Sequence, residues 1–144
     1  RNLGFEINIW DPKDYGVPNL GLTYITRQDL AQSDPELIEK FLKASLKATQ
    51  YIFDHRDEAL DIVMEYASSE QRDHQSFMLQ TELLDAIGPI TDQHGIGWMT
   101  DAQWESLYLQ LIEFEALSNP FDYKTAYTNY FLKTVYDGTE LRWP

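Results

Sequence analysis

One stretch of sequence decides the fold: Asp14-Tyr15-Gly16-Val17-Pro18-Asn19-Leu20-Gly21-Leu22-Thr23-Tyr24-Ile25-Thr26. Its first half is typical of a turn, because glycine permits left-handed backbone and proline keeps the residue before it extended. Its second half, residues 20–26, is a nearly continuous apolar run, which predicts a strand covered on both faces. The stretch therefore joins a polar turn to a buried strand, and a helix signal follows it at residues 33–37.

The turn carries side chains that suit a small polar molecule. Tyr15, Asn19 and Tyr24 flank irregular backbone, and in such a group aromatic faces supply contact area while amides supply direction. Trp10, just before the stretch, joins the same set of candidate ligand-binding residues. The alternative is a connecting turn whose two tyrosines belong to the core. Because binding residues concentrate on loops, we keep all four as predicted ligand contacts.

An alternating run precedes the turn. Phe5, Ile7 and Ile9 recur at every second position, which is the period of a half-buried strand. The sequence thus predicts two strands within residues 1–26. Two strands do not make a stable sheet alone. They must pair with strands that this chain does not contain, or with a second copy of the chain.

About five helices are predicted after the strands. The first has the clearest signal, with Asp34 as N-cap, Pro35 at the first helical position and apolar residues at three- and four-residue steps. A break at 55–57 precedes the second helix. The others are expected over about 70–87, 101–117 and 122–136, with 90–99 as a loop and a Thr100–Gln103 capping box before the fourth. The predicted fold class is therefore α/β and helix-rich.

Two of these helices carry expectations about single side chains. The third is expected to bury Phe77, Met78, Leu83, Leu84 and Ile87. The last places Tyr123, Tyr127, Tyr130 and Phe131 on one side, where core packing is the better interpretation and a pocket lining the alternative.

Composition excludes several classes of function. The net charge is −13, from 24 acidic and 11 basic residues, and such a field repels nucleic acid and anionic membrane surfaces. There is no cysteine, which excludes disulfides, zinc–thiolate sites and thiol nucleophiles. No apolar run approaches the roughly 18 residues of a membrane span. The chain starts at Arg1 without an initiator methionine, and we expect it to be a piece of a longer protein.

Nothing in the sequence argues for catalysis. His55, His74 and His94 are 19 and 20 residues apart, so no two share a helix face at the spacing of metal ligands. Acidic clusters without a partner base are typical of solvated surfaces, and no serine lies in a nucleophile-elbow pattern. We therefore predict no catalytic residue, no metal and no cofactor, and we predict that the chain is not an enzyme.

Several blocks together resemble one family. They are GFEIN at 4–8, DYGVP at 14–18, LTYIT at 22–26, DPELIEKFLKA at 34–44, HRDEALDI at 55–62, GWM at 97–99 and YTNYFL at 127–132. These blocks resemble the SsuA- and thiamine-pyrimidine-synthase-like family of substrate-binding proteins of ABC transporters. The family includes receptors for thiamine pyrimidine precursors, riboflavin and alkanesulfonates, and also the fungal thiamine-pyrimidine synthase. The resemblance covers nearly all of the chain, but only about the C-terminal half of a family member.

The resemblance implies a type 2 periplasmic-binding-protein fold, in which two α/β lobes close over a ligand. The whole chain, 1–144, would be a single fragment, with residues 1–26 forming the crossover and the cleft strands and residues 27–144 the helical part of the first lobe. The implied partners are a small heterocyclic solute (a thiamine pyrimidine precursor or a riboflavin-like molecule), an ABC permease in the membrane and the missing N-terminal half. The implied location is extracytoplasmic, in the periplasm or as a cell-surface lipoprotein.

Two alternatives belong to other classes of function. The first is an enzyme like the pyrimidine-precursor synthase of thiamine biosynthesis, whose cysteine-rich motif cannot exist in a chain without cysteine. The second is a fragment that acts only as a homo-oligomeric interaction module, for example as a homodimer that pairs through its unpaired strands.

Overall fold

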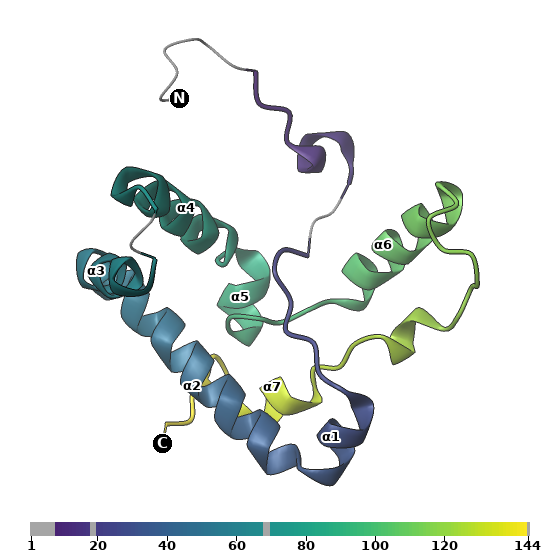
Figure 1. The fold of residues 1–144 in the computed structure, drawn as a ribbon. Helices are drawn as coiled ribbons and strands as arrows, with labels where there is room; N and C mark the ends of the chain where they lie inside the picture. The colour runs from purple at the N-terminus through teal and green to yellow at the C-terminus, as the bar shows by residue number, and fades with distance from the viewer. Residues whose placement is uncertain (1–7, 18–19, 68–69, 144) are drawn as a thin grey trace. The chain divides into compact units, whose positions relative to one another are not determined.

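The computed structural model describes residues 8–17, 20–67 and 70–143, and these are mainly helical (Figure 1). The elements are η1 (Pro12–Tyr15), α1 (Gln28–Ser33), α2 (Pro35–Asp54), α3 (Arg56–Tyr66), α4 (Arg72–Asp85), α5 (Pro89–His94), α6 (Asp101–Glu113), η2 (Tyr123–Thr125), α7 (Tyr130–Val135), β1 (Tyr136–Asp137) and β2 (Glu140–Leu141). The chain forms two compact units. The first unit is Arg1–Leu22 with Met99–Thr128, and the second unit is Thr23–Trp98 with Asn129–Pro144.

The predicted N-terminal strands are not observed where the structure can test them. Residues 20–26 form no strand and neither do residues 8–10, while residues 1–7 lie outside the described part of the chain. The physical reason is that a strand needs a partner strand, and among the described residues strand pairing is found between β1 and β2 only. The strands of the described residues lie instead at the C-terminal end, where β1 and β2 pair antiparallel. This arrangement is consistent with an α/β fragment, with the strands at the other end of the sequence.

The helix signal at residues 34–35 is confirmed. The Asp34 carboxylate accepts a hydrogen bond from the backbone N–H of Leu37 at 3.1 Å, and Pro35 occupies the first turn of α2. The predicted break also holds, because α2 ends at Asp54 and α3 begins at Arg56. The short helix α1 was missed. Its first turn carries Asp29, whose carboxylate accepts hydrogen bonds from the Arg27 guanidinium.

The core of the second unit lies between α2 and the C-terminal elements. Leu46 of α2 clusters with Leu132 and Val135 of α7 and with Tyr136 of β1, and Val135 is fully buried. Figure 1 shows α7 beside the middle of α2. Leu42, Ile96, Trp98 and Leu141 pack against this cluster. The C-terminal residues are thus held by the helix with the best capping signal in the sequence.

The predicted helix over 122–136 is wrong. The segment instead contains η2, the separate helix α7 and the strand β1. Asp122 caps only a short turn, accepting from the Lys124 N–H at 3.1 Å. The other end is a hairpin: Asp137 pairs with Glu140 around a turn in which Gly138 has φ 60°. An Asp-Gly dipeptide is a strong hairpin signal, and it explains why the helix ends before Tyr136.

The region after α3 differs from the prediction in two ways. The helix predicted at 70–87 is present as α4, but its burial was wrong: Leu83 is buried, whereas Phe77, Met78, Leu84 and Ile87 are exposed. Leu84 points away from the buried side of α4, since adjacent helical residues lie 100° apart. The prediction of a loop at 90–99 was also wrong for residues 90–94, which belong to a helix. Pro89 begins α5, and the Gly88 N–H donates to the Thr91 hydroxyl at 2.7 Å.

The capping box before α6 is confirmed. The Thr100 hydroxyl accepts from the Gln103 N–H at 3.2 Å, and the Thr100 N–H donates to the Gln103 side-chain oxygen at 2.9 Å. Met99 and Trp104 make the predicted contact across the start of this helix, with 3.4 Å between the indole nitrogen and the sulfur. α6 ends at Glu113, four residues earlier than predicted. No helix among the described residues is both long enough and apolar enough to cross a membrane.

Candidate functional site

Trp10 and Tyr15 are brought together by the turn η1. Backbone hydrogen bonds from Asp14 N–H to the Asp11 carbonyl and from Val17 N–H to the Pro12 carbonyl, both 3.0 Å long, close this turn. The two rings stack with their centroids 5.7 Å apart and their planes 13° apart. Gly16 follows with φ 77°, a conformation that glycine adopts at little cost.

The stacked pair has the physical properties of a binding surface for a planar molecule. Trp10 is 74% exposed and Tyr15 65% exposed, so most of each ring faces water. Exposure of a large aromatic surface to water is unfavourable, and stacking of a planar partner on that surface lowers the free energy. Asp11 and Asp14 lie in the same turn and are exposed, so their carboxylates disfavour an anionic partner.

The other two predicted ligand residues are placed differently. Tyr24 belongs to the second unit, where its ring meets Phe41 of α2 edge to face, with centroids 5.1 Å apart at 85°. It is 66% exposed, so it is not the core tyrosine of the alternative interpretation. Asn19 lies outside the described residues. The structure therefore brings Trp10 and Tyr15 into contact and gives Tyr24 an aromatic neighbour of its own.

The first unit contains a second group of aromatic side chains, and the sequence did not predict that they lie together. The carboxylate of Asp101, at the start of α6, accepts hydrogen bonds from the hydroxyls of Tyr123 and Tyr127, each at 3.1 Å. Trp104 stacks on Tyr127 with centroids 5.0 Å apart at 5°, and Tyr108 lies 5.7 Å from the Tyr123 ring. The partners are 22 and 26 residues apart in sequence, and no local pattern signals such contacts. This group holds η2 against α6.

The effect of Asp101 on the neighbouring tyrosines should be measurable as a shift of a tyrosine pKa. Partial burial of the ring, with the Asp101 carboxylate beside its hydroxyl, raises the pKa of Tyr123 to about 12. We expect Asp101→Asn to bring this pKa back toward the ordinary value of about 10, because the neutral amide does not repel the phenolate. The measurement is an ultraviolet difference titration of each protein against its Tyr123→Phe variant.

The same shift fixes a pH window for stability. A tyrosine whose pKa is higher in the folded than in the unfolded state stabilises fully below about pH 10, and this contribution is lost as the pH rises through about 12. Burial and Asp101 also raise the pKa of Tyr127, in the same direction. The free energy of unfolding should therefore fall between about pH 10 and 12, and less so in Asp101→Asn. An equal fall in both proteins would contradict this assignment.

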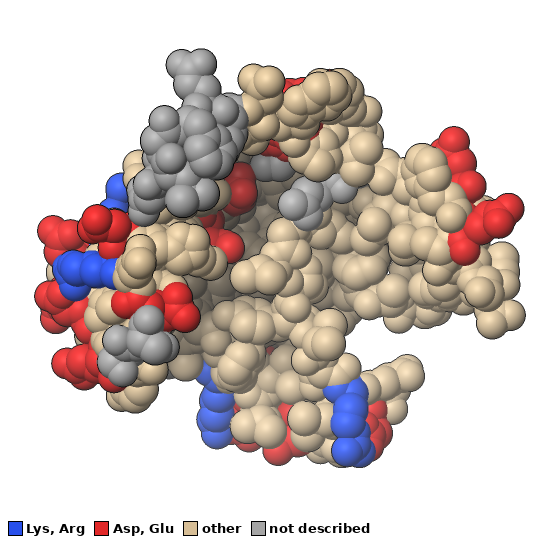
Figure 2. Space-filling model, turned by 45° about the horizontal axis from the view of Figure 1, so that its top comes forward, with Lys and Arg blue, Asp and Glu red and all other residues tan. Residues whose placement is uncertain are grey.

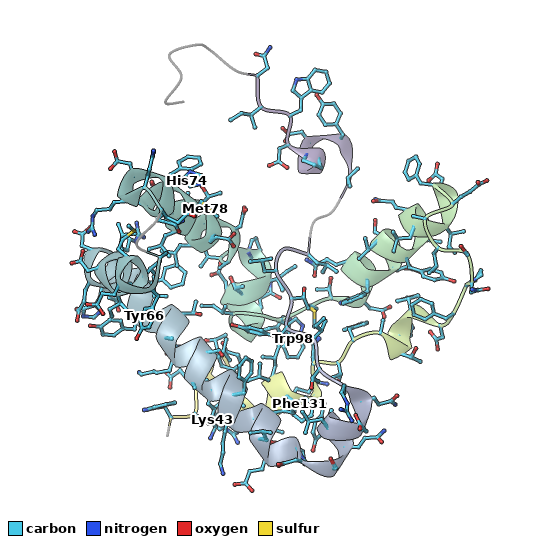
Figure 3. The ribbon with its side chains drawn as sticks, in the orientation of Figure 1. Lys43, Tyr66, His74, Met78, Trp98 and Phe131 are labelled. Atoms are coloured by element: carbon cyan, nitrogen blue, oxygen red, sulfur yellow. The ribbon has the colours of Figure 1, made fainter. Side chains whose placement is uncertain are left out.

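Two of the three histidines take part in ring stacking. His55 lies on Tyr51 with centroids 3.9 Å apart at 4°, and His94 lies on Trp98 at 4.5 Å and 18° (Trp98 is labelled in Figure 3). Among the described residues, no three His, Asp or Glu side chains gather in a way that could hold a metal ion. The chemistry of the site therefore rests on aromatic faces and hydrogen-bonding groups.

Comparison with known proteins tests the family resemblance. Residues 1–59 match the family model described as NMT1/THI5 like. The riboflavin-binding protein RibY of Chloroflexus aurantiacus is 30% identical over 138 residues, which is 92% of this chain and 38% of that protein. The formylaminopyrimidine-binding protein of Halalkalibacterium halodurans is 24% identical over 112 residues, 72% of this chain and 34% of that protein. No solved structure matches the chain significantly.

These matches bear on two predictions. The chain spans little more than a third of the length of these two relatives. Both relatives are named as binding proteins, which confirms the prediction that the chain is not an enzyme and supports a solute-binding role. The match at residues 1–59 includes the Trp10–Tyr15 turn and Tyr24. Together these matches support the resemblance to the NMT1/THI5-like family of substrate-binding proteins.

Proposed function

We propose that the protein carrying this chain is the substrate-binding component of an ABC importer and binds a small heterocyclic solute in a cleft between two lobes of a type 2 periplasmic-binding-protein fold. The chain supplies part of that protein, and polypeptide beyond it supplies the rest. The solute is a flat aromatic molecule such as a riboflavin-like flavin or a thiamine pyrimidine precursor. An ABC permease in the membrane is its partner, and its place is extracytoplasmic, in the periplasm or on the cell surface.

The exposed stack of Trp10 on Tyr15 carries this proposal. Two nearly parallel rings on a short, internally hydrogen-bonded turn offer a flat aromatic face with little conformational freedom left to lose. A heterocyclic ring placed on this face buries apolar area on both partners. The carboxylates of Asp11 and Asp14 favour a neutral or weakly cationic ring over a sulfonate. The names of the two relatives, one for a flavin and one for a pyrimidine, agree with this chemistry.

The expected result for the stacked pair is a loss of ligand affinity. In the full-length protein that carries this chain, Trp10→Ala and Tyr15→Ala should each weaken binding about tenfold or more, because each removes one of the stacked rings. Tryptophan fluorescence is titrated with riboflavin and with formylaminopyrimidine, and taurine serves as the sulfonate comparison. Tyr24→Ala tests whether Tyr24 joins the same site.

The matched control is Tyr66→Ala, a change of another highly exposed tyrosine that lies on α3 (labelled in Figure 3). It should leave the affinity unchanged. If taurine binds while both heterocycles do not, the proposed ligand class is wrong. If a heterocycle binds equally well to wild type, Trp10→Ala and Tyr15→Ala, the proposed site is wrong.

The homo-oligomeric alternative has less support. The strand at 20–26, through which two copies were expected to pair, is not formed. Residues 54–85 hold nine of the 24 acidic residues but two of the 11 basic residues. Figure 2 shows acidic side chains gathered at the left of the view, where α3 and α4 lie. Two copies that met through this region would repel each other.

A further inference from the structure

A hollow of about 350 Å³ lies in the second unit, where α2, α5 and the β1–β2 hairpin meet. It shares no residue with the Trp10–Tyr15 turn or with Tyr24. Its apolar lining comes from Ile87, Ile96 and Tyr136, and its polar lining includes Gln50, Asp92 and Thr139. Its size is at the small end of ligand pockets, so it fits a molecule of about one ring.

The floor of the hollow is rigid. The Tyr136 ring is 5% exposed, and its hydroxyl donates to the Ile96 carbonyl at 3.1 Å. The ring also lies close to Gly95, because a Cβ added there would stand 2.7 Å from the ring carbon Cζ. A ligand in the hollow would therefore meet an aromatic and peptide surface that does not need to be ordered on binding.

Three polar side chains of the hollow have hydrogen-bonding capacity to spare. Within the described part of the chain, the Gln50 amide, the Asp92 carboxylate and the Thr139 hydroxyl have no protein hydrogen-bond or ion-pair partner, and Asp92 and Thr139 are exposed to water. The Thr91 hydroxyl differs, because it is engaged with the N–H and the carbonyl of Gly88. The free groups come from α2, α5 and the hairpin turn, and all three border one hollow.

The charge of the residues that line the hollow indicates which class of ligand it would bind. Asp92 is the one ionised side chain among the residues of the hollow, and no Lys or Arg lies among them. An ionised carboxylate accepts hydrogen bonds only, and the amide and hydroxyl oxygens can accept as well. Such a lining favours a ligand that donates N–H groups and carries positive charge, and it disfavours an anion.

From this placement we propose that the hollow between α2, α5 and the hairpin is a second binding site, for a small planar cation with N–H donors, such as an amidine or a protonated amino-heterocycle. The ring of the ligand packs against the apolar lining of the hollow, and its N–H groups donate to the Asp92 carboxylate. Gln50 and Thr139 accept or donate at the edges. This site is separate from the proposed solute site and does not depend on it.

Benzamidine is the probe, because it is a one-ring amidinium cation, and benzamide is its neutral analogue. Both are titrated into the isotopically labelled full-length protein that carries this chain, and backbone amide shifts are followed by NMR. We expect benzamidine to shift the amides of Gly95, Ile96 and Thr139 saturably. Asp92→Asn should weaken its binding about fivefold, which corresponds to roughly 1 kcal/mol for an exposed charge pair.

The matched control is Asp73→Asn, which makes the same charge change on α4 outside the hollow and should leave the affinity unchanged. The proposal is overturned if benzamide binds as tightly as benzamidine, if Asp92→Asn and Asp73→Asn weaken binding equally, or if the hollow's amides do not shift. Shifts confined to Trp10, Tyr15 and Tyr24 would likewise refute this site while favouring the proposed solute site. The two proposals can therefore fail separately.

Discussion

Gly95→Ala should lower the free energy of unfolding of the second unit by about 4 kcal/mol. Gly95 has φ 88° and ψ 166°, a backbone region that is almost confined to glycine and that costs other residues about 1–3 kcal/mol. The new methyl group would also stand 2.7–2.9 Å from three atoms of the Tyr136 ring. Overpacking of this kind adds about 1–3 kcal/mol.

The Tyr136 ring cannot easily move aside. It is nearly buried, it belongs to the cluster with Leu46, Leu132 and Val135, and its hydroxyl is bonded to the Ile96 carbonyl. The strain must therefore spread into α5 or into the hairpin. Urea unfolding followed by circular dichroism measures the loss, as a lower midpoint at an unchanged slope.

Gly97→Ala is the matched control, because Gly97 has almost the same φ of 90°. Its Cβ would meet the Leu132 side chain at 3.9 Å, an ordinary van der Waals contact. We expect it to cost about 1–2 kcal/mol, from the backbone term alone. Equal losses for Gly95→Ala and Gly97→Ala would mean that the ring of Tyr136 does not rest on Gly95.

The second large effect is expected at α4, where two adjacent leucines have opposite environments. Leu83 is 5% exposed and Leu84 is 62% exposed. Leu83→Ala should cost about 2–5 kcal/mol, because it removes buried methyl groups and leaves a cavity. Leu84→Ala should cost no more than about 0.5 kcal/mol, as is usual for surface substitutions. The same unfolding experiment measures both.

This pair tests the structure against the sequence-based expectation, which buried both leucines. Similar large losses at both positions would mean that the outer side of α4 is covered in solution. Phe77 lies on the same side of α4 as Leu84, seven residues or about two turns earlier, and it is 52% exposed. Phe77→Ala should then follow the behaviour of Leu84→Ala.

Several features of the fold were predictable because their causes are local. The start of α2 needs only Asp34, Pro35 and the Leu37 N–H, all within four residues. The capping box at Thr100 and Gln103 is equally local, and it fixed the start of α6 to the residue. Hydrogen bonds that close within one turn of helix are encoded in neighbouring residues, so the sequence states them directly.

The candidate site was partly predictable for the same reason. Glycine, proline and aspartate marked the turn, and Trp10 and Tyr15 are only five residues apart, so a short turn suffices to stack them. Their role as ligand contacts, together with those of Tyr24 and Asn19, remains a proposal. The family resemblance came from blocks spread along the chain, and the comparisons support it.

Other features depend on partners that are distant in sequence, and for these the sequence alone misled us. The apolar run at 20–26 reads as a strand, yet a strand exists only where a neighbour completes its hydrogen bonds. The regular spacing of Tyr123 and Tyr127 suggested one helix, but Asp101, more than 20 residues earlier, binds both hydroxyls and holds a short turn instead.

By itself, then, the sequence determined the starts of α2 and α6, the aromatic turn, the acidic character and the family resemblance. Tertiary structure alone decided that Leu83 rather than Leu84 is buried, that Tyr136 rests on Gly95 and that Gln50, Asp92 and Thr139 border one hollow. The reason is how far apart in sequence the interacting residues lie. Caps and turns are satisfied by neighbours in sequence, whereas burial and cavities depend on which elements pack together, and that is settled by the free energy of the whole fold.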